Sequence, residues 1–152
     1  MGETALVILT TALPFSELRG GLPLALALGF HPLLALPLTV VVNSLIFFPL
    51  FWIVKLFYDR GVSRIILLRR IIERTRRKGS PYVNRYGLLG LTLFVAIPLP
   101  MTGTYSGTLL GWLLGIEWRK AFLAIFLGVF LAGWLVLAAS LGVFQFLAWV
   151  IR

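Results

Sequence analysis

Two stretches of similar pattern decide the fold of this chain: ALPFSELRGGLPLALALGFH at residues 12–31 and AIPLPMTGTYSGTLLGWLLGIE at residues 96–117. Each holds two short apolar segments on either side of a polar turn that is rich in Gly and Pro. An Ala-aliphatic-Pro triplet precedes both turns, and small residues at four-residue spacing follow both. These small residues are Gly21, Ala25 and Gly29 in the first stretch and Gly107, Gly111 and Gly115 in the second.

The chain therefore contains an internal repeat, with a two-residue insertion in its second turn. Hydrophobic segments that are broken at corresponding places in two halves are typical of a transport site near the middle of a membrane.

The composition also predicts a membrane protein. The chain has 152 residues, of which 60% are hydrophobic and 12% are charged, and its mean hydropathy is +1.00. A soluble domain of this size cannot bury so much apolar surface, so we predict a polytopic membrane protein. The chain has no cysteine, which excludes a disulfide framework.

Segment length distinguishes two kinds of apolar segment. A helix needs about 20 residues to cross a hydrocarbon core of about 30 Å, and residues 32–57 and 119–140 meet that requirement. The arms of the two stretches are about half as long. They lie at residues 4–13, 22–30, 86–97 and 106–116. We predict that each pair of arms forms a re-entrant hairpin, whose irregular backbone must be covered by protein or water; the alternative is two thin spanning helices per pair.

The fold class that we expect is all-α, an inverted-topology repeat in which each half is a re-entrant hairpin followed by a transmembrane helix. Because one spanning helix separates the hairpins, they must enter from opposite faces around a pseudo-twofold axis in the membrane plane. We expect a single membrane domain, with a first repeat at residues 1–57, a basic amphipathic cytoplasmic linker at residues 58–79 and a second repeat at residues 80–152.

Positive charge predicts the orientation of the chain. Residues 55–85 hold ten of its fourteen Lys and Arg residues, and Arg119 and Lys120 lie where the second hairpin would leave the membrane on the same face. The opposite face would carry Arg152. This bias predicts a multi-pass protein of the inner (cytoplasmic) membrane, with its linker in the cytoplasm and both termini outside. We expect membrane lipids as partners, with anionic headgroups at the linker, and no nucleic acid.

Two ionisable residues, Glu17 and Arg19, lie in the first turn. Charged groups at membrane depth cost several kcal/mol unless they are paired or hydrated, so these two mark a candidate site. Burial favours the uncharged form of a carboxylic acid, which makes Glu17 the candidate for proton coupling. The permanently charged, forked guanidinium of Arg19 suits a phosphate or carboxylate as substrate-binding group. The alternative is a structural role, either as a mutual ion pair or with Arg19 capping the carbonyls of an arm.

The second turn carries hydroxyl groups and no charge, and we predict that it completes the substrate site. The arm that follows it points its N-terminal dipole at the middle of the membrane, and so does the arm after the first turn; helix N-termini favour an anion. The candidate substrate-binding residues there are Thr102, Thr104, Tyr105 and Ser106. Asn43, in the first span, is a further candidate because its counterpart in the repeat is Val129. Helix capping by the hydroxyls and an interhelical hydrogen bond of Asn43 are the alternatives.

Other classes of function lack a signal in the sequence. It contains no catalytic triad, metal-ligand cluster or phosphate-binding loop, so we expect neither an enzyme nor a metal nor a cofactor. Small residues at positions 124, 128 and 132 allow two helices to approach closely and make a homodimer feasible.

Two segments resemble a known family: ELRGGLPLALALGF near the start and YGLLGLTLFVAIPLPMTGTYSGTLLGWLLGI, with Asn43 between them. They are similar to the small multidrug export family of bacterial and archaeal membrane proteins. The architecture also resembles the wider DedA superfamily, whose paired re-entrant hairpins are implicated in moving polyprenyl phosphates and other lipids. That resemblance implies an acidic residue in the first hairpin, which Glu17 matches. It also implies arginines in the second hairpin, where this chain has none, so that Arg19 would have to supply the positive charge.

Three functions are compatible with these features. The first is proton-coupled transport of an anionic lipid, such as a polyprenyl phosphate, or of an amphiphile, between the two hairpins. The second is proton-coupled export of small cationic drugs at Glu17, which the charge of Arg19 disfavours by about 1–4 kcal/mol in a wet site. The third is a non-transporting membrane scaffold.

Overall fold

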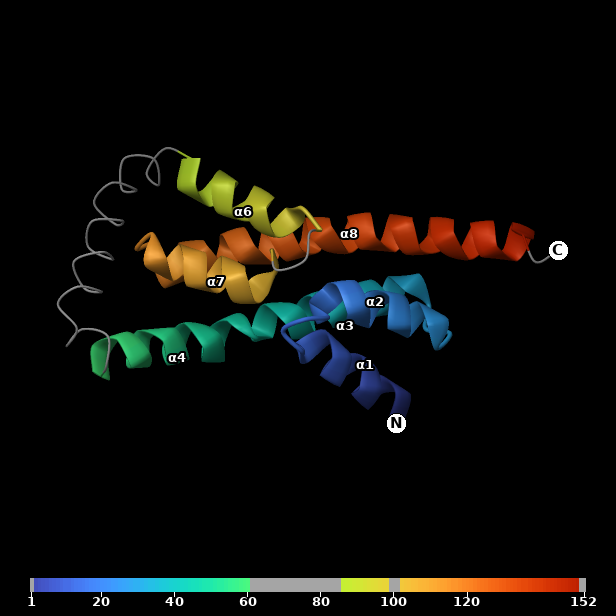
Figure 1. The fold of residues 1–152 in the computed structure, drawn as a ribbon, viewed down its shortest axis with the longest axis horizontal. Helices are drawn as coiled ribbons and strands as arrows, with labels where there is room; N and C mark the ends of the chain where they lie inside the picture. Colours follow the sequence, from blue (N-terminus) through green and yellow to red (C-terminus); the bar gives the residue numbers. More distant parts are fainter. Residues whose placement is uncertain (1, 61–85, 99–101, 151–152) are drawn as a thin grey trace.

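The computed structural model describes residues 2–60, 86–98 and 102–150, and within these ranges it is all-helical with no strand. Two long helical rods run antiparallel, and two short helical hairpins pack beside them (Figure 1). The helices are α1 (Gly2–Ala12), α2 (Glu17–Ala27), α3 (Pro32–Leu45), α4 (Phe47–Arg60), α6 (Leu88–Ala96), α7 (Thr104–Leu113) and α8 (Trp118–Val150). The predicted basic linker falls almost entirely outside the described residues.

The two rods are the spans that segment length predicts. The stretches Pro32–Tyr58, of 27 residues, and Trp118–Val143, of 26 residues, are long and apolar enough to cross a membrane. The first is divided into α3 and α4 at Ile46, three residues before Pro49, because proline has no N–H to donate to the carbonyl four residues earlier. The second rod, α8, continues to Val150, ten residues beyond the predicted end at residue 140.

The two hairpins open at opposite ends of the rods. Hairpin α1/α2 opens toward the end where α3 begins, and hairpin α6/α7 opens toward the end where α4 stops (Figure 1). Their tips meet near the middle of the rods. The arms are therefore short helices of 9 to 11 residues, as predicted.

The first turn is shorter than the sequence indicates. We expected the second arm to begin at residue 22, but α2 begins at Glu17 and includes Gly20 and Gly21. Gly21 serves packing within the hairpin, because a Cβ there would collide with the Thr11 side chain of α1, whereas a Cβ on Gly20 would meet Ser16 just before α2. In the second hairpin, a Cβ on Gly107 would lie 2.6 Å from Val95 of α6. Glycine at these positions lets the two arms of each hairpin pack closely.

Both hairpins end in the same way. Gly29 and Gly115, which lie 86 positions apart, have φ angles of +84° and +74°. The N–H groups after them, on Phe30 and Ile116, each donate across the helix end to a carbonyl five residues earlier, both at 3.0 Å. A left-handed residue with these bonds is a helix C-terminal motif that favours glycine. The small residues that the repeat aligns therefore have the same structural task in both halves.

The core lies where α8 crosses α3 and both hairpins. It is made of small and branched apolar side chains that are nearly inaccessible: Val7, Leu22, Ala25, Ala35, Val95, Ala121, Ile125 and Val129. Large apolar side chains also cover the outside, including Leu33, Trp52, Leu89, Leu127 and Trp134. Because water would disfavour such an exterior, this arrangement suits lipid as the surrounding solvent.

Candidate functional site

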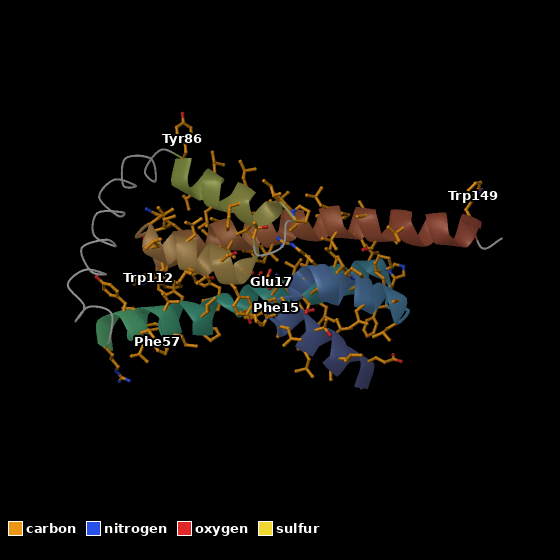
Figure 2. All side chains as sticks on the ribbon, in the orientation of Figure 1. Phe15, Glu17, Phe57, Tyr86, Trp112 and Trp149 are labelled. Atoms are coloured by element: carbon orange, nitrogen blue, oxygen red, sulfur yellow. The ribbon has the colours of Figure 1, made fainter. Side chains whose placement is uncertain are left out.

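The candidate site lies where the two hairpin tips meet. Glu17, the first residue of α2, and Phe15 lie at the centre of the molecule, whereas Phe57 and Trp112 lie toward one end and Trp149 at the other (Figure 2). Aromatic side chains at both ends and a carboxylate in the middle are the expected order for a chain that spans a bilayer.

The Glu17 carboxylate caps the N-terminus of α7. Its side chain is buried, with 6% exposed, and its Oε1 accepts a hydrogen bond from the Tyr105 backbone N–H at 3.3 Å. A Cβ on Gly103, the residue just before α7, would collide with the same carboxylate. A negative group is stabilised at a helix N-terminus by the unpaired N–H groups and the helix dipole. The anion position that the sequence predicts for a substrate is thus filled by a side chain of the protein itself.

Glu17 also has an unusual backbone conformation. Its φ angle is +47°, a left-handed value that side-chain-bearing residues seldom adopt. Such strain costs of order 1–3 kcal/mol and persists only where surrounding contacts enforce it, often at functional sites. Here it turns the chain from the hairpin tip into α2 and brings the carboxylate against the opposite hairpin.

Arg19 forms the second contact between the tips. Its Nη2 donates to the Ile97 carbonyl at 3.1 Å and to the Thr102 hydroxyl at 2.8 Å, and that hydroxyl donates to the Ile97 carbonyl at 2.7 Å. Ile97 follows the last residue of α6, so a positive group lies at the carbonyl end of that helix. The first hairpin therefore places an acidic side chain, Glu17, at the start of α7 and a basic side chain, Arg19, at the end of α6.

The remaining predicted hydroxyls lie at the same place, but two of them bond within the chain. The Tyr105 hydroxyl donates to the Ala12 carbonyl of α1 at 2.7 Å, and the Ser106 hydroxyl donates to the Gly103 carbonyl at 3.3 Å. The Thr104 hydroxyl oxygen is buried and has no hydrogen-bond partner among the described residues. The structure thus gathers the predicted residues, and those that already have partners would have to exchange them in order to bind a substrate.

Asn43 lies beside Glu17 at a small cavity. The cavity has a volume of about 10 Å³ and is lined by Glu17, Leu18, Arg19, Asn43, Val95, Gly103, Val129 and Ala132. Asn43 and Val129, which the repeat aligns with each other, both line it. Asn43 is 2% exposed, and its Oδ1 has no hydrogen-bond partner within the described part of the chain.

A larger, mostly apolar groove reaches Glu17 from the side of α4 and α7. It has a volume of about 380 Å³ and is lined by Pro14, Phe15, Glu17, Leu50, Val54, Tyr105, Ser106 and Leu109. No Lys or Arg is among these residues, and Glu17 is the one residue that lines both the groove and the cavity. Phe15, at the hairpin tip, is 98% exposed.

The sequence analysis missed Gly103 and the groove. A signal for Gly103 was present, because positions 17 and 103 differ by the same 86 residues that relate Gly29 to Gly115. The groove residues carry no such signal, since apolar side chains in a membrane helix look alike whether they line a groove or contact lipid. Among the described residues, no group of three or more His, Asp or Glu side chains could hold a metal ion.

A comparison with known protein families identifies the family to which the chain belongs. Residues 17–135 match the model of a family described as "Putative small multi-drug export protein". The chain belongs to this family. The match begins at Glu17 and extends from α2 through the second hairpin into α8, so Glu17, Arg19, Asn43 and Gly103 of this small multidrug export family member lie within it, whereas α1 precedes it. No curated protein and no solved structure matches the chain at a significant level. The family and the two apolar rods together identify a membrane protein.

Proposed function

We propose that the chain crosses the membrane with α3–α4 and α8, and that its hairpins are re-entrant and related by inverted topology. The packing of the two halves supports this proposal. In the first half α2 packs on α1, on α3 and on α8; in the second half α7 packs on α6, on α8 and on α4. Likewise α1 packs on α3, and α6 on α8. Each contact of one half thus has its counterpart in the other.

The orientation is part of the proposal. The end at which α4 stops and hairpin α6/α7 opens also carries Lys55, Arg119 and Lys120, which supports a cytoplasmic location for that end in the inner membrane. The basic linker would then lie on anionic lipid headgroups. A homodimer and the absence of enzymatic activity remain predictions from the sequence.

The proposed activity is proton-coupled export of small lipophilic cations. One observation carries it: Glu17, which is buried, lines a mostly apolar groove, and no Lys or Arg is among the described residues that line it. Such a groove suits the apolar body of a lipophilic cation, and the carboxylate suits its charge. The groove volume of about 380 Å³ is in the range of small-molecule sites.

Coupling would follow from competition for one group. The ionised Glu17 carboxylate, stabilised by the N-terminus of α7, binds the cation, and the protonated form releases it. Arg19 does not line the groove, and it donates to the end of α6, so its repulsion of a bound cation is weaker than its place in the sequence indicates. A single acid that binds either a proton or a cation is sufficient for exchange.

Transport of an anionic lipid is the second candidate, and Arg19 is the observation that favours it. Arg19 is only half-buried and lies at the hairpin contact, where a phosphate could meet its guanidinium. The neighbouring carboxylate of Glu17 and the internal bonds of Thr102 and Tyr105 disfavour this function. A scaffold without transport is the third candidate from the sequence. It gives no functional reason for the strained backbone conformation of Glu17.

The test is transport by the purified chain in liposomes with a pH gradient. We expect uptake of tetraphenylphosphonium or ethidium that depends on the gradient, and no movement of a labelled polyprenyl phosphate. Glu17→Gln should abolish uptake while the protein still accumulates in membranes. Glu117→Gln, which removes an exposed carboxylate paired with Lys120 at 3.8 Å, is the matched control and should retain uptake. Lipid movement without cation uptake would establish the second candidate, and no movement of either would favour the scaffold.

A further inference from the structure

We infer that the small cavity beside Glu17 is the site of one ordered water, held by Asn43, and that the proton reaches Glu17 through this water while the substrate uses the groove. The assignment of the water rests on the cavity alone. Its role in coupling rests on the proposed function.

The size of the cavity limits what it can hold. Its volume of about 10 Å³ is close to the minimum for a single water molecule. A drug or a lipid headgroup does not fit. Asn43, which the sequence presents as a candidate for substrate binding, therefore lines a space that is too small for a substrate.

The polar groups around the cavity match the bonding capacity of one water. A buried water needs two to four polar partners. Glu17, Asn43 and Arg19 line the cavity. Their side chains offer a carboxylate and an amide oxygen as acceptors and a guanidinium as donor, and the Asn43 Oδ1 is buried without a partner among the described residues. A water can donate one hydrogen to each acceptor and accept from the guanidinium. The positive charge of Arg19 disfavours a metal cation in the same space.

The water site belongs to one half of the repeat. On the opposite wall Val129 takes the position equivalent to Asn43, and a valine side chain offers no hydrogen bond. Gly103, equivalent to Glu17, offers no side chain either. Asn43 is thus a positioning residue: without its carbonyl oxygen the water loses one of two acceptors, and the Asn43 amide is otherwise a buried polar group without a partner for that oxygen among the described residues.

Two routes then meet at one carboxylate. The groove and the cavity share Glu17 and no other lining residue. A cation in the groove would meet Glu17 from the side of α4 and α7, while the water would meet it from the side of Asn43. A proton can therefore leave Glu17 by way of the water while a cation occupies the groove.

Infrared difference spectroscopy tests the water directly. Spectra of the full chain in lipid, taken between the protonated and ionised forms of Glu17, should contain a water O–H band that shifts in H₂¹⁸O. The band should disappear in Asn43→Val and return in Asn43→Val/Val129→Asn, which moves the amide to the opposite wall. Thr39→Val is the matched control: Thr39 is buried one turn earlier on α3, but its hydroxyl donates to the Ala35 carbonyl at 2.8 Å, and the band should persist. A band that is absent from the wild type, or that survives in Asn43→Val, would overturn the assignment.

A second measurement tests the separation of the two routes. When saturating tetraphenylphosphonium is mixed with the chain in detergent, the proton that it displaces can be followed with an indicator dye. Asn43→Val should slow this release by about tenfold, equivalent to about 1.4 kcal/mol, and Thr39→Val should not. Leu109→Trp, which fills the groove, should weaken cation binding and leave the water band intact. Equal release rates in Asn43→Val and wild type would contradict the proton route. A wild type that binds no cation would defeat the proposed function, whereas the infrared result decides the water site by itself.

Discussion

The Glu17 carboxylate lies against the backbone of Gly103, where the tips of the two hairpins meet. The two positions are separated by 86 residues, the interval that relates the two hairpins to each other. One member of the pair has a charged side chain and the other has none, and the absence of a side chain at Gly103 is what makes room for the charge.

Gly103→Ala should disrupt this contact. The new methyl group would collide with the carboxylate, and overpacking of this kind costs about 1–3 kcal/mol. We expect a lower midpoint of thermal unfolding and the loss of cation binding. Gly142→Ala is the control, because a Cβ there meets nothing within 4 Å. Restoration of stability in Glu17→Ala/Gly103→Ala would show that the carboxylate is the group that clashes; additive losses would contradict the contact.

Gly29→Ala should destabilise the chain although space is available. No atom lies within 4 Å of a Cβ at this position, but the φ angle of +84° is unfavourable for alanine and costs about 1–2 kcal/mol. Gly90→Ala, equally open but within helix α6, should instead be neutral or stabilising by up to about 1 kcal/mol. Thermal unfolding of the two variants in the same detergent makes the comparison. Similar midpoints would indicate that the end of the first hairpin differs from that described.

Tyr105→Phe should loosen the contact between the hairpins. It removes the donor to the Ala12 carbonyl, a bond of 2.7 Å that joins α7 to α1, and a net loss of about 0.5–1.5 kcal/mol is expected. Ser106→Ala removes a hydroxyl whose bond stays within its own helix end, and should cost less. The measurement is the unfolding midpoint of each variant. A larger effect for Ser106→Ala would argue against the tip-to-tip hydrogen bond.

Arg19→Gln distinguishes a cation site from an anion site. Glutamine keeps N–H groups that can donate to the Ile97 carbonyl but removes the positive charge. At a cation site, binding of tetraphenylphosphonium should tighten by about fivefold, since a unit charge about 4 Å away contributes about 1 kcal/mol in water. Binding of a lipid phosphate should be absent in both proteins. If Arg19→Gln instead abolishes phosphate binding that the wild type has, the anionic lipid is the substrate class.

Single cysteines test the orientation, because the chain contains none. His31 and Lys120 are both exposed and lie at opposite ends of the rods. In intact cells an impermeant thiol reagent should label His31→Cys and should reach Lys120→Cys only after permeabilisation. The reverse pattern would invert the proposed topology, and labelling of both without permeabilisation would contradict a cytoplasmic location for the end that carries Lys120.

The sequence predicts the helical rods and arms better than it predicts the contacts between the hairpin tips. Length and hydropathy identify both rods, and four-residue spacing of small residues identifies the second arms, because these signals are local. The role of Gly20 and Gly21 could not be predicted, since a glycine pair marks a turn and a close helix contact equally well. The left-handed Glu17 and its position over Gly103 depend on how two distant tips meet. The hydroxyls of Thr102 and Tyr105 were interpreted as ligands because their partners, Arg19 and the Ala12 carbonyl, lie more than 80 residues away.

The contact between Glu17 and Gly103 has a consequence for how such a molecule can arise. If two identical copies of one half were assembled, the same residue would occupy both positions. An acid would then meet an acid, and two like charges would compete for one buried space; a glycine would meet a glycine, and no charge would be present. Halves that are encoded separately along one polypeptide can diverge, so that one supplies the carboxylate and the other the room for it. A carboxylate at the centre therefore depends on the two halves having different residues at this pair of positions.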